Sequence, residues 1–432
     1  MGSYSSLKLA DYEIGTSKSY IDPYWACLFK ETDKRSRQVH YGGYYEVPLD
    51  NDSELVPTTE YAVSAEAMKL RLEIMGFTLE KVKQNFEYHI AQVLKDRKDF
   101  YGEDKADDDD RNKLNHITTL KNNGFDGWLK AISHIMAQKL NIWDLPFDRN
   151  IEQDDLYSFM LTYDDIFEDL TLGYPHIGFG YLLRGLLETV SPNDELILDL
   201  TSLVYSGYYA EDESVCENAW QTQINATLEF QKIIILTEGT SDSQYLSRSL
   251  NVLYPEVARY FSFLDFDTLK PDGGSSALEK TVKSFAAAGV NNKLIALFDN
   301  DAAGMASVKR LGKKPLPANV RVLLLPELEL GLKYPTLGPQ GETEENINGR
   351  ACSIEMYFGT DVLRTENGYT PISWRNLEPQ INEYQGEIMY KDEVQKRFLK
   401  KLTLAEKKGL HLEDDWSGLR LIFEKVFCAA SK

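Results

Sequence analysis

The sequence predicts an α/β protein. Its C-terminal half is expected to form a doubly wound, mostly parallel sheet, preceded by a mainly helical (α+β) N-terminal half. Apolar runs at 233–236, 294–298 and 320–325 have the length and continuous apolar character of strands buried on both faces. Helical patterns separate these runs, and such alternation is typical of parallel sheets. From about residue 88 to residue 231, apolar residues recur mainly at helical spacing.

The first hundred residues contain one strand and one helix that local patterns identify. Apolar and polar residues alternate around Leu7 and Leu9, which predicts a short edge strand. Residues 61–79 carry an amphipathic helical pattern. Gly76 is placed to end that helix, because glycine readily takes left-handed backbone angles.

The middle region shows three apolar helix faces, at residues 125–140, 181–190 and 196–205. An acidic run at 103–110 precedes them. We expect this run to be a solvated loop, because neighbouring like charges repel one another and favour water.

The C-terminal half supplies helices between its strands. Helices are predicted at 242–254, 277–288, 302–311 and after residue 391, with a further strand at 260–266. Two glycines and two serines at 273–276 suit the start of the second helix, and Gly289 suits its end.

Two of the predicted strands end abruptly in carboxylates and a glycine. Glu-Gly-Thr-Ser-Asp follows the first at 238–242, and Asp-Asn-Asp-Ala-Ala-Gly follows the second at 299–304. In an open α/β sheet, groups just past the carboxyl ends of the strands converge on one crevice. Glu238, Asp242, Asp299 and Asp301 are therefore expected to face one another. Such a group favours a hard divalent cation, Mg²⁺ or Mn²⁺; the alternative is a pair of solvated loops.

This pair of motifs resembles the Toprim domain of topoisomerases, bacterial primases and the overcoming-lysogenization-defect (OLD) nucleases. The resemblance covers roughly residues 230–400. It implies that Glu238 is a general acid or base or a metal ligand, and that Asp299 and Asp301 bind metal. Asp242 matches the second carboxylate of the first motif and is counted with the catalytic residues.

Two later residues are similar to features of OLD-type nucleases. Glu355 looks like the glutamate of their late acidic motif, and Lys391 is similar in placement to a late basic residue that stabilises phosphate charge. An ordinary surface lysine explains Lys391 equally well. Ser353 stands where those nucleases often have an aspartate, so one metal ion or two remain open.

The N-terminal region resembles bacterial HEPN/Toprim-associated proteins over roughly residues 1–100. The opening strand and the segment Arg-Leu-Glu-Ile-Met-Gly-Phe-Thr-Leu at 71–79 carry the resemblance. It implies a role in bacterial conflict and antiphage defence. Four regions are then expected: 1–100, associated with HEPN and Toprim; 101–230, helical and HEPN-like; 231–400, the Toprim catalytic domain; and 401–432, a helical tail.

HEPN ribonucleases use Arg-x4–6-His on a helix. Arg111 and His116 fit this spacing, and so do Arg35 and His40. Chance explains the second pair better. For Arg111 and His116, a surface role near the start of a helix outweighs the catalytic one.

The negative net charge of the chain is the main argument against an enzyme that binds nucleic acid. The formal net charge is -21, and phosphate binding depends on local Lys and Arg. A basic partner subunit could deliver the substrate, or the acidic surface could restrain the enzyme until displaced. A local basic patch is the third explanation, with Lys309, Arg310, Lys313 and Lys314 as its candidates. We favour a patch together with a partner, although these residues could equally form a solvated helix end.

Other features of composition indicate a cytoplasmic protein. The four cysteines lie far apart, as reduced thiols do, and form no zinc-like cluster with the six histidines. No apolar run is long enough to span a membrane, and the N-terminus lacks the pattern of a secretory leader.

Three functions remain in contention. The first is an Mg²⁺-dependent (or Mn²⁺-dependent) Toprim endonuclease acting in defence, since 432 residues leave no room for the additional domains of a topoisomerase or primase. The second is a metal-independent HEPN ribonuclease, and the third a non-catalytic sensing subunit. No P-loop motif occurs, so a partner ATPase must be a separate chain. A homo- or hetero-oligomer is expected, and DNA and RNA both remain open as substrates.

Overall fold

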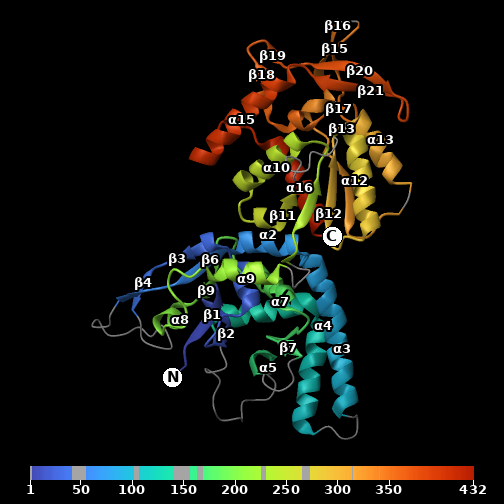
Figure 1. Cartoon of the computed structure of the whole chain (residues 1–432). Helices are drawn as coiled ribbons and strands as arrows, with labels where there is room; N and C mark the ends of the chain where they lie inside the picture. The colour runs from blue at the N-terminus through green and yellow to red at the C-terminus, as the bar shows by residue number, and fades with distance from the viewer. Residues whose placement is uncertain are drawn as a thin grey trace. The chain divides into compact units, whose positions relative to one another are not determined.

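The structure is a computed structural model that describes residues 2–40, 55–101, 107–140, 156–162, 169–224, 230–264, 273–313, 315–339 and 341–432. It divides into two compact units: unit 1, Met1–Thr227, and unit 2, Leu228–Lys432 (Figure 1). Each unit has its own sheets and its own buried residues. Within the ranges given, no helix is both long enough and apolar enough to cross a membrane.

Unit 1 is built on a five-stranded antiparallel sheet with the order β2-β1-β9-β6-β3. Its strands are β1 (Tyr4–Leu9), β2 (Tyr12–Lys18), β3 (Lys34–Arg35), β6 (Glu60–Ser64) and β9 (Glu195–Asp199). β9, from far along the chain, therefore joins the regions 1–100 and 101–230 into one sheet.

Two predictions about this sheet are wrong. β1 is an inner strand, because β2 and β9 pair with its two sides. Residues 196–199 form the central strand, and only α8 (Thr201–Tyr205) is helical within the helix predicted at 196–205. Leu196, Ile197 and Leu198 are all buried. A short run buried on both faces lacks the alternation that distinguishes a strand from a helix.

The helix predicted at 61–79 begins later than expected. Its first residues belong to β6, and α2 spans Ala65–Met75. The Ser64 hydroxyl accepts a hydrogen bond from the Ala67 backbone N–H and so caps the first turn. Gly76 ends the helix with φ of 103°, as predicted.

Arg71, in the segment 71–79, is fully buried in α2. Its guanidinium donates to the Leu28 carbonyl at 2.9 Å and to the Asp33 carboxylate at 2.8 Å. Because a buried charge is costly unless it is paired and hydrogen-bonded, these contacts explain why an arginine can occupy this position. They tie α2 to residues 28–33.

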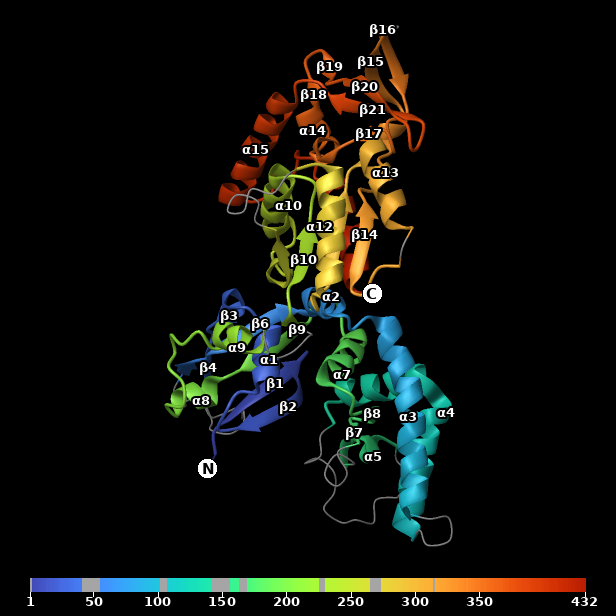
Figure 2. The same cartoon turned by 45° about the vertical axis from the view of Figure 1, so that its right-hand side comes forward.

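A long helical hairpin forms much of the remainder of unit 1. α3 (Leu79–Tyr101) and α4 (Asp108–Ala137) lie side by side (Figure 2). Between them, the rings of Phe86 and Trp128 have centroids 5.9 Å apart, and Trp128 meets Tyr174 at 5.1 Å. α4 contains the helix face predicted at 125–140.

The acidic run before α4 is only partly a loop. Asp107 accepts a hydrogen bond from the Asp110 backbone N–H at 2.9 Å and caps the helix. The first turn of α4 is acidic, which suits the positive end of the helix dipole. The predicted loop is therefore wrong from Asp107 onward, and residues 103–106 lie outside the described part of the chain.

The other elements of unit 1 are short. They are α1 (Pro23–Leu28), η1 (Glu31–Asp33), β4 (Gln38–His40), β5 (Leu55–Pro57), α5 (Leu156–Thr162), β7 (Leu170–Thr171), β8 (Tyr174–Pro175), α7 (Phe179–Leu186), η3 (Leu187–Thr189) and α9 (Val215–Gln223). The helix predicted at 181–190 corresponds to α7 and η3.

Unit 2 contains the predicted parallel sheet. Its four strands follow the order β11-β10-β12-β14, and every neighbouring pair is parallel. The strands are β10 (Ile233–Leu236), β11 (Phe261–Phe263), β12 (Leu294–Phe298) and β14 (Val320–Leu324). The helices around them are α10 (Thr240–Leu253), α12 (Ser275–Ala288), α13 (Ala302–Leu311) and α16 (Ser417–Ala430).

Helices cover both faces of this sheet. Leu294, Ala296 and Phe298 of β12 belong to a core shared with α12 and α13. Leu297, on the opposite face of the strand, meets residues of α10 and α16. The parallel sheet and the predicted helices 242–254, 277–288 and 302–311 are thus confirmed.

Beyond the parallel sheet, short strands bring later segments to its carboxyl edge. β13 (Asn300–Asp301) pairs with β17 (Ala351–Cys352), which directly precedes η7 (Ile354–Tyr357). A second sheet has the order β16-β15-β20-β21. The remaining elements are η5 (Ala258–Tyr260), η6 (Leu330–Leu332), β15 (Tyr334–Gly338), β16 (Gly341–Glu345), α14 (Thr360–Leu363), β18 (Arg364–Thr365), β19 (Gly368–Tyr369), β20 (Ile372–Glu378), β21 (Glu383–Ile388) and α15 (Lys391–Lys408).

Candidate functional site

The first two acidic motifs meet at the carboxyl ends of β10 and β12, which are adjacent parallel strands. The Glu238 carboxylate accepts a hydrogen bond from the Asp299 backbone N–H at 3.0 Å. Asp242 lies in the first turn of α10, just after Glu238. In both motifs the strand is followed by a carboxylate and then by a helix, and this order places both motifs at one edge of the sheet, as the sequence predicts.

Asp301 is the N-cap residue of α13. One of its oxygens accepts a hydrogen bond from the Gly304 backbone N–H at 2.7 Å, and the other accepts one from the Gln385 amide at 2.5 Å. Gln385 also accepts from the Ala303 backbone N–H at 2.9 Å. Burial raises the pKa of Asp301, although these donors oppose the rise. The β21 glutamine therefore fixes both the carboxylate and the start of the helix.

The packing around Gly304 explains why the second motif ends in a glycine. A Cβ at this position would lie 2.2 Å from the Asp299 carbonyl oxygen, far inside any real contact. The first turn of α13 can pack this tightly against the end of β12 only because residue 304 has no side chain.

Glu355 reaches the same region from η7 and is fully buried. Its oxygens accept hydrogen bonds from the Ser353 hydroxyl at 2.7 Å and the Gln395 amide at 2.8 Å. The Lys391 ammonium lies 3.1 Å from the same carboxylate. Burial alone would lower the pKa of Lys391, but the hydrogen bond and charge of Glu355, together with the charges of Asp299 and Asp242, outweigh burial and raise the pKa. Lys391 is thus an ion-pair partner within the site.

The electrostatics show that these carboxylates lie close together. Burial, followed by the charge of Asp301, raises the pKa of Glu238 to about 8. Burial, followed by the charge of Glu355, raises the pKa of Asp242 to about 6. The pKa of Asp299 lies well above its ordinary value because it is buried beside Glu238. We call these five residues the acidic cluster.

The donor set of the acidic cluster fits a hard cation. Its carboxylate oxygens are the ligands that Mg²⁺ prefers, and burial, followed by the charges of neighbouring carboxylates, raises the pKa values of Glu238 and Asp299. Across the described ranges, no three His, Cys, Asp or Glu side chains are already arranged to hold a metal ion. Mg²⁺ does not require such a cage, because it usually binds through one or two carboxylates, water and substrate phosphates.

A cavity of about 510 Å³ lies beside Lys391. Residues of β20, β21 and the start of α15 line it, including Arg375 and Glu387, which form an ion pair at 3.1 Å. Tyr390 also lines the cavity and is 64% exposed. Lys391 therefore borders both the acidic cluster and an open space next to it.

The HEPN candidates lie near the start of α4. The Arg111 guanidinium pairs with Asp108 at 3.3 Å and is largely exposed. The His116 ring stacks on Phe159, with centroids 4.9 Å apart. Five residues of α-helix turn by about 140°, so the two side chains leave the helix in different directions. Their catalytic pairing stays a prediction.

The sequence-predicted basic patch lies at the far end of α13 from Asp301. Arg310 pairs with Glu279 at 2.6 Å and donates to the Gln380 amide oxygen at 2.8 Å. Its charge is therefore already compensated. Lys314 lies outside the described residues.

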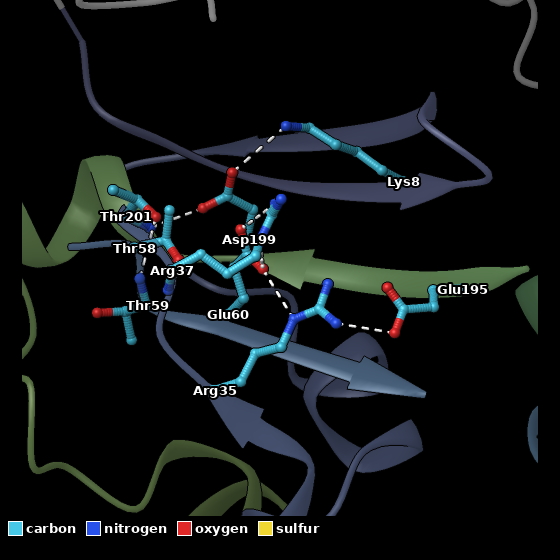
Figure 3. A network of polar contacts seen from close by, with 9 residues as sticks. All are labelled: Lys8, Arg35, Arg37, Thr58, Thr59, Glu60, Glu195, Asp199 and Thr201. Carbon is cyan, nitrogen blue, oxygen red and sulfur yellow. Dashed lines mark hydrogen bonds and ion pairs between the residues drawn. The ribbon is translucent and has the colours of Figure 1, made fainter. Parts of the chain in front are cut away.

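Unit 1 holds a separate polar network on its sheet (Figure 3). The buried Glu60 carboxylate accepts hydrogen bonds from Arg35 at 3.1 Å and from Arg37 at 2.7 Å, and Arg35 also pairs with Glu195 at 2.8 Å. Burial alone would raise the pKa of Glu60, but the two guanidiniums lower it. Arg35, on β3, thus links β6 and β9 through its two ion pairs. The side chain of His40, which has the HEPN spacing to Arg35, lies outside the described part of the chain.

Two residues of the site were not predicted from the sequence. Gln385 and Gln395 hold Asp301 and Glu355 in place. Neither belongs to a recognisable motif, and a neutral amide carries no charge pattern. Only the fold identifies them, although the stretch around Gln385 does lie next to the predicted Lys391 helix.

Comparison with known families gives one match. A family model described as HEPN/Toprim N-terminal domain 1 matches residues 1–223, slightly more than half of the 432 residues. The match extends well beyond the resemblance noted over residues 1–100 and spans nearly all of unit 1. No curated protein and no solved structure matches the chain.

Proposed function

The chain belongs to the HEPN/Toprim N-terminal domain 1 family, and from this premise we propose that it is a nuclease whose unit 2 is a Toprim-like, metal-dependent catalytic domain. The family name links the chain to nuclease-related proteins. The observation that carries the proposal is the acidic cluster, in which the Glu238 carboxylate accepts the Asp299 backbone N–H at the edge of a parallel sheet. The reaction is hydrolysis of nucleic-acid phosphodiester bonds.

The cluster residues take different parts in this reaction. Glu238 and Asp299, with Asp301 behind them, would hold Mg²⁺ or Mn²⁺. The bound ion supplies Lewis acidity toward the phosphodiester and its attacking water. Without metal, burial raises the pKa of Glu238 to about 8. A bound cation would lower that pKa, so Glu238 would then act as a carboxylate, either as a metal ligand or as a general base. Lys391 offers positive charge to the phosphate.

The cavity beside Lys391 is the path by which we expect the substrate strand to reach the cluster. It lies against Lys391 and carries the exposed ring of Tyr390, on which an unpaired base could stack. The mixed charge around it, with Arg375 already paired to Glu387, favours one strand over a broad phosphate-binding surface.

The setting we propose is a cytoplasmic effector of bacterial antiphage defence. The family match supports a link to HEPN and Toprim proteins, and none of the four cysteines forms a disulfide. A separate subunit, such as an ATPase, would bring the substrate to this acidic chain.

Cleavage assays test the proposal directly. The purified full chain is incubated with plasmid, single-stranded DNA and total RNA, in Mg²⁺, Mn²⁺ or EDTA. We expect metal-dependent cleavage that EDTA abolishes. Glu238→Gln and Asp299→Asn should each slow it by about a hundredfold or more, the usual effect of losing an acid–base group.

His116→Ala is the matched control and should leave the rate unchanged. RNA cleavage that persists in EDTA but disappears in His116→Ala would instead identify a HEPN ribonuclease. Nucleic-acid binding without turnover under every condition would identify a sensing subunit.

A further inference from the structure

Glu355 differs from the other cluster carboxylates because donors already surround it. The hydroxyl of Ser353, the amide of Gln395 and the ammonium of Lys391 all lie within 3.1 Å of its two oxygens. The residue is also fully buried. These three donors occupy most of the lone pairs of Glu355, so a metal ion would have to compete with them for this carboxylate.

The donors are held by the fold and do not reach in from solvent. Lys391 and Gln395 are one helical turn apart in α15 and so present one face to Glu355. Ser353 is the N-cap residue of η7, which also carries Glu355. A metal ion that took the place of the lysine would leave the Lys391 ammonium without its carboxylate partner and beside a divalent cation, which is unfavourable.

The other side of the cluster has no such set of donors among the described residues. There, Glu238 accepts one hydrogen bond, from the Asp299 backbone N–H. Among the interactions of the described residues, Lys391 is the only cation within hydrogen-bonding or ion-pair reach of a cluster carboxylate, and that carboxylate is Glu355. The acidic cluster therefore has one half, at Glu238 and Asp299, with which Lys391 does not pair directly, and one half, at Glu355, with which it does.

We propose that Lys391 occupies the place of a second metal ion, so that the site binds one divalent cation per chain, at Glu238 and Asp299. The inference rests on the proposed function, because it concerns the metal of that same site. Ser353 supports it: in this chain a hydroxyl donates to Glu355 where a further carboxylate would help to hold a second ion. One divalent ion and one fixed ammonium then face the substrate phosphate together.

Metal counting tests the inference without reference to activity. Mg²⁺ binding to the full chain is measured by isothermal calorimetry, and Mn²⁺ binding by electron paramagnetic resonance. Wild type should bind one ion and give the spectrum of isolated Mn²⁺. Lys391→Met should bind two ions and give a spin-coupled spectrum, because ions in two-metal sites lie about 3.5–4 Å apart.

Two variants serve as controls. Lys396→Met removes the same charge from an exposed position of α15, and should still bind one ion. Lys391→Arg keeps the positive charge beside Glu355 and should also bind one ion. Circular dichroism of all variants establishes that each is folded.

The outcomes separate the two proposals. Two ions in wild type, or one ion in both wild type and Lys391→Met, would overturn the role assigned to Lys391 while leaving a metal-dependent nuclease in place. No binding up to millimolar metal in any variant would overturn the proposed metal site itself, and this inference with it.

Discussion

Glu238, Asp301 and Glu355 are carboxylates of one cluster, yet their hydrogen-bond partners give them different tasks. Asp301 caps α13 and is held by Gln385. Glu355 is neutralised by Lys391. Glu238 has no paired cation among the described residues, and burial, followed by the charge of Asp301, raises its pKa to about 8. At the residue scale, the number of donors already present decides which carboxylate is left for a ligand.

The raised pKa of Glu238 predicts how stability depends on pH without metal. Between its ordinary value of 4.5 and about 8, the folded chain holds a proton that the unfolded chain has released. This contribution to stability is complete below pH 4.5 and is lost as pH rises through about 8. In EDTA, the melting temperature should therefore fall by several degrees between about pH 5.5 and about pH 8.5.

Differential scanning calorimetry measures this change, and Glu238→Gln is its control. The variant cannot lose a proton at this position, so its melting temperature should fall less over the same range. Mg²⁺ should raise the melting temperature of wild type at the higher pH. An equal fall in wild type and variant would mean that other groups, such as Asp242 with its raised pKa of about 6, cause the effect.

At the scale of elements, the site depends on how closely α13 approaches β12. The approach is possible because Gly304 has no Cβ to strike the Asp299 carbonyl oxygen. Directly after β12, the two carboxylates and the first turn of α13 therefore fit into six residues, 299–304. The spacing of the motif reflects backbone packing as well as metal chemistry.

This packing predicts the effect of adding one methyl group. Gly304→Ala must push the start of α13 away from Asp299, and it should weaken Mg²⁺ binding by about tenfold or more, equivalent to at least 1.4 kcal/mol. Gly312→Ala, just after the same helix, is the matched control, since its Cβ would lie 3.6 Å from the nearest atom, the Val308 carbonyl oxygen.

Calorimetric titration with Mg²⁺ gives the two dissociation constants, and circular dichroism checks that both variants are folded. Gly304→Ala with the affinity of wild type would show that Asp299 does not need its present position to bind metal.

At the scale of the whole molecule, a chain with a net charge of -21 must bind a nucleic acid, which is also negatively charged. Three described cations of unit 2 are already paired: Arg310 with Glu279, Arg375 with Glu387, and Lys391 with Glu355. Because their charges are shared with carboxylates, the metal is expected to carry most of the contact with substrate.

Nucleic-acid binding should therefore depend weakly on salt. With one or two phosphates neutralised, the slope of log K against log salt should be no steeper than about -2. Fluorescence anisotropy with a labelled strand, Mg²⁺ and the Asp242→Asn variant, which we expect not to cleave the strand, measures it across several salt concentrations. A much steeper slope would point to a basic binding surface away from the acidic cluster.

The sequence by itself determined the parallel sheet of unit 2 and the convergence of its first two acidic motifs. Both follow from local patterns: a short apolar run, then carboxylates, then a helix. Sequence also located Gly76 and Gly289 at helix ends, because a left-handed backbone angle requires little beyond the glycine itself.

Only the tertiary structure decided the order of the unit 1 sheet and the partners of the carboxylates. β9 is a central strand because distant segments pair with it, and its own sequence is equally compatible with a helix. Likewise Gln385, Gln395 and Lys391 approach Asp301 and Glu355 from segments far along the chain. Contacts between remote segments leave no local periodicity, so no pattern of neighbouring residues could reveal them.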